Sequence, residues 1–295
     1  MEPLLLGALA LGLAYALLAI GIFITMRVYN FPDITADGSL TLGGALSGAL
    51  LTAGWSPITT LGIATLGGAA AGSITGLIHT KLKVNGILSG ILVMTALYSV
   101  NLRIMGRSNI PLITTPTLFT PITSILPAAS DQVVALLLLL PLTIVALVAL
   151  SWLFRTDFGI AMRATGDNET MMAAQGTNVD TMKIVGIAIA NGSIAASGSI
   201  VAQYQGYADI GMGIGIIVFG LASVIIGDTL ASLFSGRYRI ALRLVGVVIG
   251  SILFRALVAF TLSLGLDPTD LKLTTAVFVL LTIAMPGLRK STPYS

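Results

Sequence analysis

Charged side chains that could do chemistry are few in this sequence, and six of them lie within one stretch, Phe154–Asp180. Asp167, Asn168 and Glu169 would begin a short helix, because acidic residues complement the positive end of the helix dipole. Gly176 and Asn178 would end it, because both tolerate the left-handed backbone that follows a last turn. The residues between these ends are small or soft, namely Met171, Met172, Ala173 and Ala174. This composition predicts a docking helix rather than a catalytic loop.

Arg255 is the most unusual single residue, because it lies inside an apolar run twelve positions beyond Arg243. At about 1.5 Å per helical residue it is roughly 18 Å further along, near the middle of a membrane. An arginine there costs about 2.5–3.5 kcal/mol on insertion scales. We therefore expect a partner, and the candidates are Asp209, Asp267 or the exposed backbone of a broken helix.

Other polar side chains also interrupt the apolar runs. Their alternatives are hydrogen bonds between helices and the lining of a water-filled pathway, since such groups make poor contacts with lipid. Asp33 and Thr35, beside Pro32, could equally cap a helix entry. The candidate pathway residues are Asp33, Thr35, Asn85, Ser89, Tyr98, Asn101, Asn191 and Arg255.

Enzymatic readings have little support. Cysteine is absent, which excludes thiolate chemistry and cysteine metal sites, and the sequence holds no HExxH, GxSxG or Walker A pattern. Gly211, Gly213 and Gly215 lie inside an apolar run, so they predict an unwound helix start rather than a nucleotide loop. We expect no cofactor or metal on this chain. The basic residues stand singly rather than in a patch, so we expect no nucleic-acid partner.

Apolar segments must position all these residues. Only 9% of the 295 residues are charged, against about 25% in soluble domains. Nine runs are long enough to span a membrane, and they lie at roughly 3–26, 34–54, 57–79, 86–106, 132–154, 182–206, 211–234, 240–264 and 271–288. The second and seventh could be broken or re-entrant, so eight to ten spans are possible. The fold class is all-α, a polytopic membrane protein in contact with lipid, with residues 1–295 as one domain.

The distribution of lysine and arginine predicts the orientation. Threading nine spans with the N-terminus outside leaves only Arg103, Arg107 and Lys272 on the outer side, with Arg255 inside a span. The cytoplasmic side then holds the other eleven, namely Arg27, Lys81, Lys83, Arg155, Arg163, Lys183, Arg237, Arg239, Arg243, Arg289 and Lys290. Positive charge favours the cytoplasm, so the C-terminus and the segment at about 155–180 are predicted to be cytoplasmic.

Glycine spacing predicts how two spans pack. Gly68, Gly72 and Gly76 recur every four residues in the third run. They would form a flat helix face on which a neighbouring backbone approaches closely.

The segment from Phe158 to Asn178 resembles a family of bacterial ABC importer permeases, the group that includes branched-chain amino acid, ribose and nucleoside permeases. Its sequence, FGIAMRATGDNETMMAAQGTN, is similar to the family's cytoplasmic coupling segment, roughly G-R-A-x-R-A-x-G-x-N-x-x-A-A-x-x-G-I-N. The stretch 31–39, FPDITADGS, resembles the family's D-L-[TS] element. Segments 84–89 and 105–111, with the C-terminal part around Gly265 and Leu271, look like a subgroup of tryptophan/tyrosine-type permeases.

The resemblance implies a coupling helix that seats on a separate ATPase subunit. Its residues here would be Arg163, Gly166, Asp167, Asn168, Glu169, Met171, Met172, Ala173, Ala174, Gly176 and Asn178. It also implies a second permease copy, expected as a homodimer, and an external solute-binding protein or lipoprotein. ATP and magnesium would bind the ATPase, and the machine would lie in the bacterial inner membrane.

The substrate implied is a small polar nutrient, most simply an aromatic or branched-chain amino acid, with a sugar or nucleoside as the alternative. A different class, an ion-coupled secondary transporter or flippase, would need a membrane-embedded acid. No mid-span carboxylate is evident in the sequence.

Overall fold

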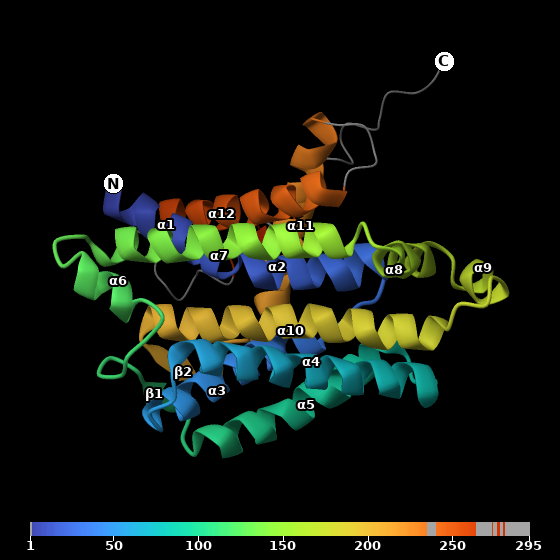
Figure 1. Cartoon of the computed structure of the whole chain (residues 1–295), viewed down its shortest axis with the longest axis horizontal. Helices are drawn as coiled ribbons and strands as arrows, with labels where there is room; N and C mark the ends of the chain where they lie inside the picture. Colours follow the sequence, from blue (N-terminus) through green and yellow to red (C-terminus); the bar gives the residue numbers. More distant parts are fainter. Residues whose placement is uncertain (1, 235–239, 264–272, 274–275, 278–279, 281–295) are drawn as a thin grey trace.

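The computed structural model describes residues 2–234, 240–263, 273, 276–277 and 280 of the chain. Most of them lie in helices that run side by side, and two short strands form an antiparallel ribbon (Figure 1). The elements are α1 (Glu2–Ala14), α2 (Ala16–Phe23), the π-helical turn η1 (Ile24–Val28), α3 (Thr35–Thr52), α4 (Pro57–Lys81), α5 (Gly86–Met105), β1 (Asn109–Pro111), α6 (Thr120–Ile125), α7 (Asp131–Leu153), α8 (Asp157–Asp167), α9 (Glu169–Ala174), α10 (Val179–Gln205), β2 (Tyr207–Asp209), α11 (Ile216–Phe234) and α12 (Ile240–Ser263).

The helices confirm an all-α polytopic membrane protein. Among the described residues, α4, α5, α7, α10 and α12 are long and apolar enough to cross a membrane. The first run adds a sixth span if α1 and α2 are counted together, although they bend by 41° at Tyr15. The ninth predicted run, 271–288, lies almost wholly outside the described residues. The number of spans and their orientation therefore stay predictions.

Helix α10 lies at the centre of the bundle. In its most apolar window 78% of the residues are buried, against 22–44% for the other candidate spans. It packs mainly on α3 and α4, and also on α2. Its contact with α4 uses the predicted glycine face, because Gly68 and Gly72 lie directly against the backbone of Asn191 and Ile187. A side chain at either glycine would overlap that backbone, so the close approach predicted from the spacing is confirmed.

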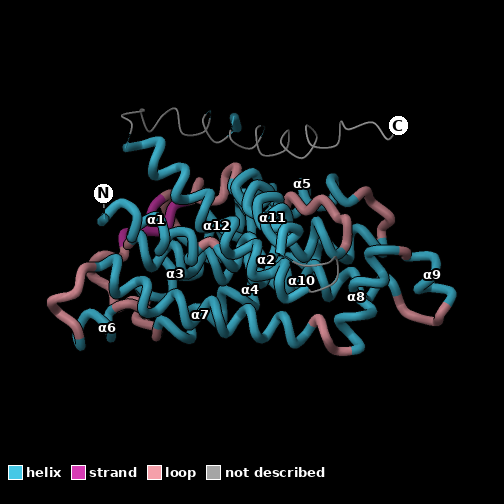
Figure 2. Tube along the Cα trace, turned by 90° about the horizontal axis from the view of Figure 1, so that it is seen from above, coloured by secondary structure: helices cyan, strands magenta, loops and turns pink. Residues whose placement is uncertain are grey.

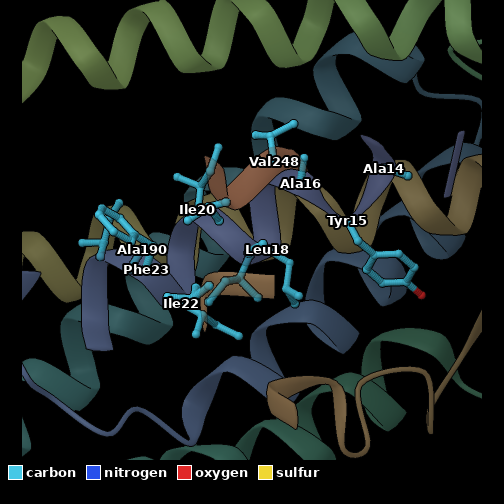
Figure 3. Packing of buried hydrophobic residues seen from close by; sticks show 14 of the residues in the cluster. Ala14, Tyr15, Ala16, Leu18, Ile20, Ile22, Phe23, Ala190 and Val248 are labelled. Carbon is cyan, nitrogen blue, oxygen red and sulfur yellow. The ribbon is translucent and has the colours of Figure 1, made fainter. Parts of the chain in front are cut away.

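The apolar core surrounds α2 (Figure 3). Leu18, Ile20 and Phe23 are fully or almost fully buried, and residues of α10 and α12 such as Ala190 and Val248 belong to the same cluster. Close packing of this kind gives membrane helices their affinity for one another, because lipid tails are as apolar as the side chains.

Two helices begin inside the bundle rather than at its ends. The first residue of α3, Thr35, shares a 2.8 Å hydrogen bond with Thr75, which lies six residues before the end of α4 and so roughly 9 Å inside it. Helix α11 begins at Ile216, after a turn over 210–215 that packs on α3 at Gly213. The unwound start predicted for the seventh run is confirmed, whereas α3 itself is continuous.

The two ends of the bundle differ. The ribbon of β1 and β2 and the short helix α6 lie at one end, and α8 and α9 lie at the opposite end (Figure 1). The view from above in Figure 2 shows the same separation, with α9 furthest from the centre. The ends of α5 and α10 are joined by the ribbon, in which Asn109 pairs with Asp209.

Candidate functional site

The segment at about 155–180 folds as two short helices, α8 and α9, between α7 and α10. Three side chains cap the helix starts: the Thr156 hydroxyl accepts from Gly159 N–H, the Asn168 amide oxygen from Met171 N–H, and the Asn178 amide oxygen from Thr181 N–H. Gly176 adopts φ +83°, which suits glycine after a last turn. The predicted short helix is confirmed as α9, whereas α8 is an additional helix before it.

Helix α9 presents one soft face outward. Met171 is 47% exposed, and Ala173, Ala174 and Gly176 are exposed beside it. Met172, the next residue, is only 6% exposed, so its side chain packs against the protein. An unbranched thioether surrounded by small residues is an adaptable docking surface.

The pair α8–α9 is fixed to the bundle by contacts on its inner side. Gly166 lies against the Val28 carbonyl group at the end of η1, and the Asn30 amide donates to the Gly166 carbonyl oxygen at 3.3 Å. Glu169 forms an ion pair of 2.6 Å with Lys183 on α10. A movement of α9 would therefore be transmitted to η1 and to the start of the central helix.

Arg163 and Asp167 face away from the soft surface. They line a cavity of about 220 Å³ between α8, η1 and the start of α12, together with Arg27 and Arg243. The Arg27 guanidinium pairs with Asp228 at 2.6 Å. These charged groups lie at the junction of α8 with the bundle.

A chain of hydrogen bonds crosses the middle of the bundle. Asp33 is buried, and it accepts from the Asn191 amide at 2.6 Å and from Thr35 N–H at 2.9 Å. The Asn191 amide oxygen in turn accepts from the Ser39 hydroxyl at 2.7 Å. Asp33, Thr35 and Asn191 are thus brought together as a brace between α3, α4 and α10. Asp33 lies in the loop before α3 rather than within a span, and this loop is packed inside the bundle.

The polar residues of α5 point in different directions from the helix and have different surroundings. Asn85 caps the helix start by accepting from Ile87 N–H, and Ser89 is buried and donates to the Asn85 carbonyl oxygen. Asn101 is buried against α3, where its amide donates to the Gly38 carbonyl oxygen at 3.2 Å. Tyr98 is 53% exposed and lines an open groove between α3, α5 and the 210–214 turn.

Asp37 also lines this groove, and sequence reasoning did not single it out. Its carboxylate accepts from the N–H groups of Gly215 at 2.9 Å and Ile217 at 3.2 Å, so it caps α11 from another helix. Its place in the first turn of α3, within a polar stretch, was the available signal. The segment that it caps is distant in the sequence.

Arg255 lies over two aromatic rings. Its guanidinium carbon is 4.2 Å from the Tyr15 ring centre and 5.0 Å from that of Phe219. Asp209, a predicted partner, instead accepts from Asn109 and from Gly211 N–H, so that prediction is wrong. Asp267 lies outside the described residues. Aromatic faces attract a cation without adding a second buried charge, and Tyr15 stands at the α1–α2 break.

Comparison with known proteins identifies the class. A family model described as "Branched-chain amino acid transport system / permease component" matches residues 4–286. The tyrosine transport system permease protein of Clostridioides difficile (strain R20291) is 38% identical over 279 residues, which are 95% of this chain and 90% of that protein. An uncharacterised protein of Rickettsia prowazekii (strain Madrid E) is 30% identical over 95% of this chain and 97% of its own length.

Among solved structures, PsaBC from Streptococcus pneumoniae in complex with a Fab matches at a TM-score of 0.48. The two share 16% sequence identity over 93% of this chain and 89% of that one.

Proposed function

Because this chain belongs to the family of permease components of branched-chain amino acid transport systems, we propose that it is the membrane subunit of an ATP-driven importer. Two copies would form the pathway, a separate ATPase would bind α8 and α9, and an external solute-binding protein would deliver the substrate. ATP and magnesium would bind the ATPase alone. The complex would lie in the bacterial inner membrane.

The exposed face of α9 is the observation that carries this proposal. A six-residue helix at the end of the bundle exposes Met171, while Gly166 and Glu169 connect the same segment to η1 and α10. When a partner outside the membrane moves such a segment, these contacts would transmit the movement to the centre of the fold. A helix held only by its two ends would not transmit that movement.

An amino acid is the substrate that we favour, and an aromatic one in particular. The support is the name of the 38% identical relative, a tyrosine transport system permease protein. Substrate choice in such a machine would be shared with the solute-binding protein.

Uptake into proteoliposomes tests the proposal. The complex of this chain with its ATPase and solute-binding protein should accumulate labelled L-tyrosine only when ATP is present on the ATPase side. A parallel sample receives a proton or sodium gradient without ATP, because the buried Asp33 is a feature that an ion-coupled transporter would share. Uptake driven by the gradient alone would contradict the importer assignment.

A further inference from the structure

The groove between α3, α5 and the 210–214 turn has the size and lining of a small-molecule site. Its volume is about 470 Å³, within the range of ligand pockets, and its wall includes the side chains of Met94, Tyr98 and Ile214. It lies where α11 begins inside the bundle. Irregular backbone at membrane depth is tolerated when it is buried in protein or lines a cavity, and this turn meets that condition.

Asp37 supplies the groove with one negative charge. Each carboxylate oxygen accepts one backbone N–H, from Gly215 or from Ile217, and so each keeps a lone pair for a further donor. Among the ion pairs within the described part of the chain, none involves Asp37. The two backbone N–H donors stabilise the charged form of the carboxylate, and within the described part of the chain no lysine or arginine forms an ion pair with it.

A second acceptor stands on the same wall. Asn101 lines the groove and is 1% exposed, and its amide nitrogen donates a hydrogen bond to the Gly38 carbonyl oxygen. Its amide oxygen has no hydrogen-bond partner in the described structure. A buried carbonyl oxygen without a partner costs about 1–3 kcal/mol, so Asn101 adds an unsatisfied acceptor to the wall of the groove.

The spare hydrogen-bonding groups of the groove are therefore mainly acceptors. The Thr41 hydroxyl donates to the Asp37 carbonyl oxygen, and the Thr95 hydroxyl donates to that of Ile91, so both can only accept from a ligand. A carboxylate with neighbouring acceptors fits an ammonium group, whose three N–H donors need such partners. An anionic ligand would meet a like charge at Asp37, and only the hydroxyl groups of Tyr98 and Ser99 could donate to it.

We propose that this groove is a transit site that recognises the substrate's α-ammonium group, with Asp37 as its counter-charge and the apolar wall holding the side chain. The inference rests on the proposed function, because it deepens the assignment of an amino acid substrate. Asp37 would thus set a requirement for a primary amine inside the membrane subunit, separate from the selection made by the solute-binding protein.

The alternative role of Asp37, as a cap for α11 alone, is separated by substitution with asparagine. Asp37→Asn keeps one carbonyl oxygen that can accept from Gly215 or Ile217, and asparagine is as good a helix cap as aspartate. It removes the charge. Asp209→Asn is the matched control, because Asp209 also accepts a backbone N–H, at 2.8 Å from Gly211, but does not line the groove.

The test uses the assembled importer in proteoliposomes, with L-tyrosine uptake and ATP hydrolysis measured on the same preparation. In Asp37→Asn, uptake should fall by about tenfold or more, the effect expected for one charge-assisted hydrogen bond. ATP hydrolysis stimulated by the solute-binding protein should stay within about twofold of the wild type. Asp37→Glu should recover part of the uptake, and Asp209→Asn should transport like the wild type.

Three results would overturn the site. Normal uptake by Asp37→Asn would show that the charge is not used, and an equal fall of uptake and ATP hydrolysis would assign Asp37 to capping α11 alone. If the wild type transports the deaminated analogue 3-(4-hydroxyphenyl)propionate as fast as tyrosine, the groove does not recognise the ammonium group. Failure of the wild type to move any amine with ATP would instead refute the proposed function, and the transit site with it.

Discussion

Gly166→Ala tests how the α8–α9 segment is held on the bundle. A Cβ at position 166 would overlap the Val28 carbonyl oxygen and crowd the Cα atom of Tyr29. Both are backbone atoms, which cannot rotate aside, so α8 must move away from η1. The movement would also weaken the 3.3 Å hydrogen bond from Asn30 to the Gly166 carbonyl oxygen.

The size of the effect follows from these contacts. Overpacking costs about 1–3 kcal/mol and the hydrogen bond about 0.5–1.5 kcal/mol, while replacing a helical glycine by alanine returns up to about 1 kcal/mol. The net cost is therefore about 0.5–4.5 kcal/mol. Since about 1.4 kcal/mol is a factor of ten, the docked position of α8 should be populated about twofold to a thousandfold less.

The measurement is the affinity of the purified chain for its ATPase, with uptake recorded in parallel. Gly62→Ala is the matched control, because Gly62 lies in α4 and an added Cβ there would meet nothing within 4 Å beyond its own stretch of helix. It should leave both readings unchanged. If Gly166→Ala binds the ATPase and supports uptake like the wild type, the contact with Val28 does not set the position of the docking segment.

Two further predictions follow from burial and hydrogen bonding. Met171→Ala should weaken ATPase binding without changing the thermal stability of the chain. Met172→Ala should instead lower the stability by about 2 kcal/mol, because it leaves a cavity at a buried site. The reverse pattern, measured by melting and by ATPase binding, would contradict the assigned faces of α9. Asn191→Ala should destabilise the chain by about 2 kcal/mol or more, because it removes the Asp33 and Ser39 partners. Ser193→Ala, which removes only a bond within α10, should melt close to the wild type.

Local patterns predicted the features that depend on neighbours in the sequence. The start of α9 at Glu169 follows from capping by Asn168, and its end from Gly176, because both act within one turn. The glycine face of α4 follows from spacing along a single helix. Span lengths follow from the thickness of the bilayer.

Features that depend on distant segments could not be predicted in this way. The break at Tyr15 lies in a uniformly apolar run, and Tyr15 packs on Phe219 and Arg255, more than 200 positions away. The entry of Asp33 into the bundle needs Asn191 of α10, and the cap of α11 needs Asp37 of α3. Each of these pairs joins helices whose contact is set by the packing of the whole bundle.

The central claim is that a separate ATPase docks on α9, and affinity purification of this chain from its native membrane tests it most directly. A Walker A ATPase should co-purify with the wild type and be lost with Glu169→Lys, which places two positive charges where Glu169 and Lys183 now pair at 2.6 Å. The exchanged pair Glu169→Lys with Lys183→Glu should restore the ion pair, and with it part of the ATPase binding. A chain that purifies without an ATPase, yet moves substrate on an ion gradient, would contradict the account.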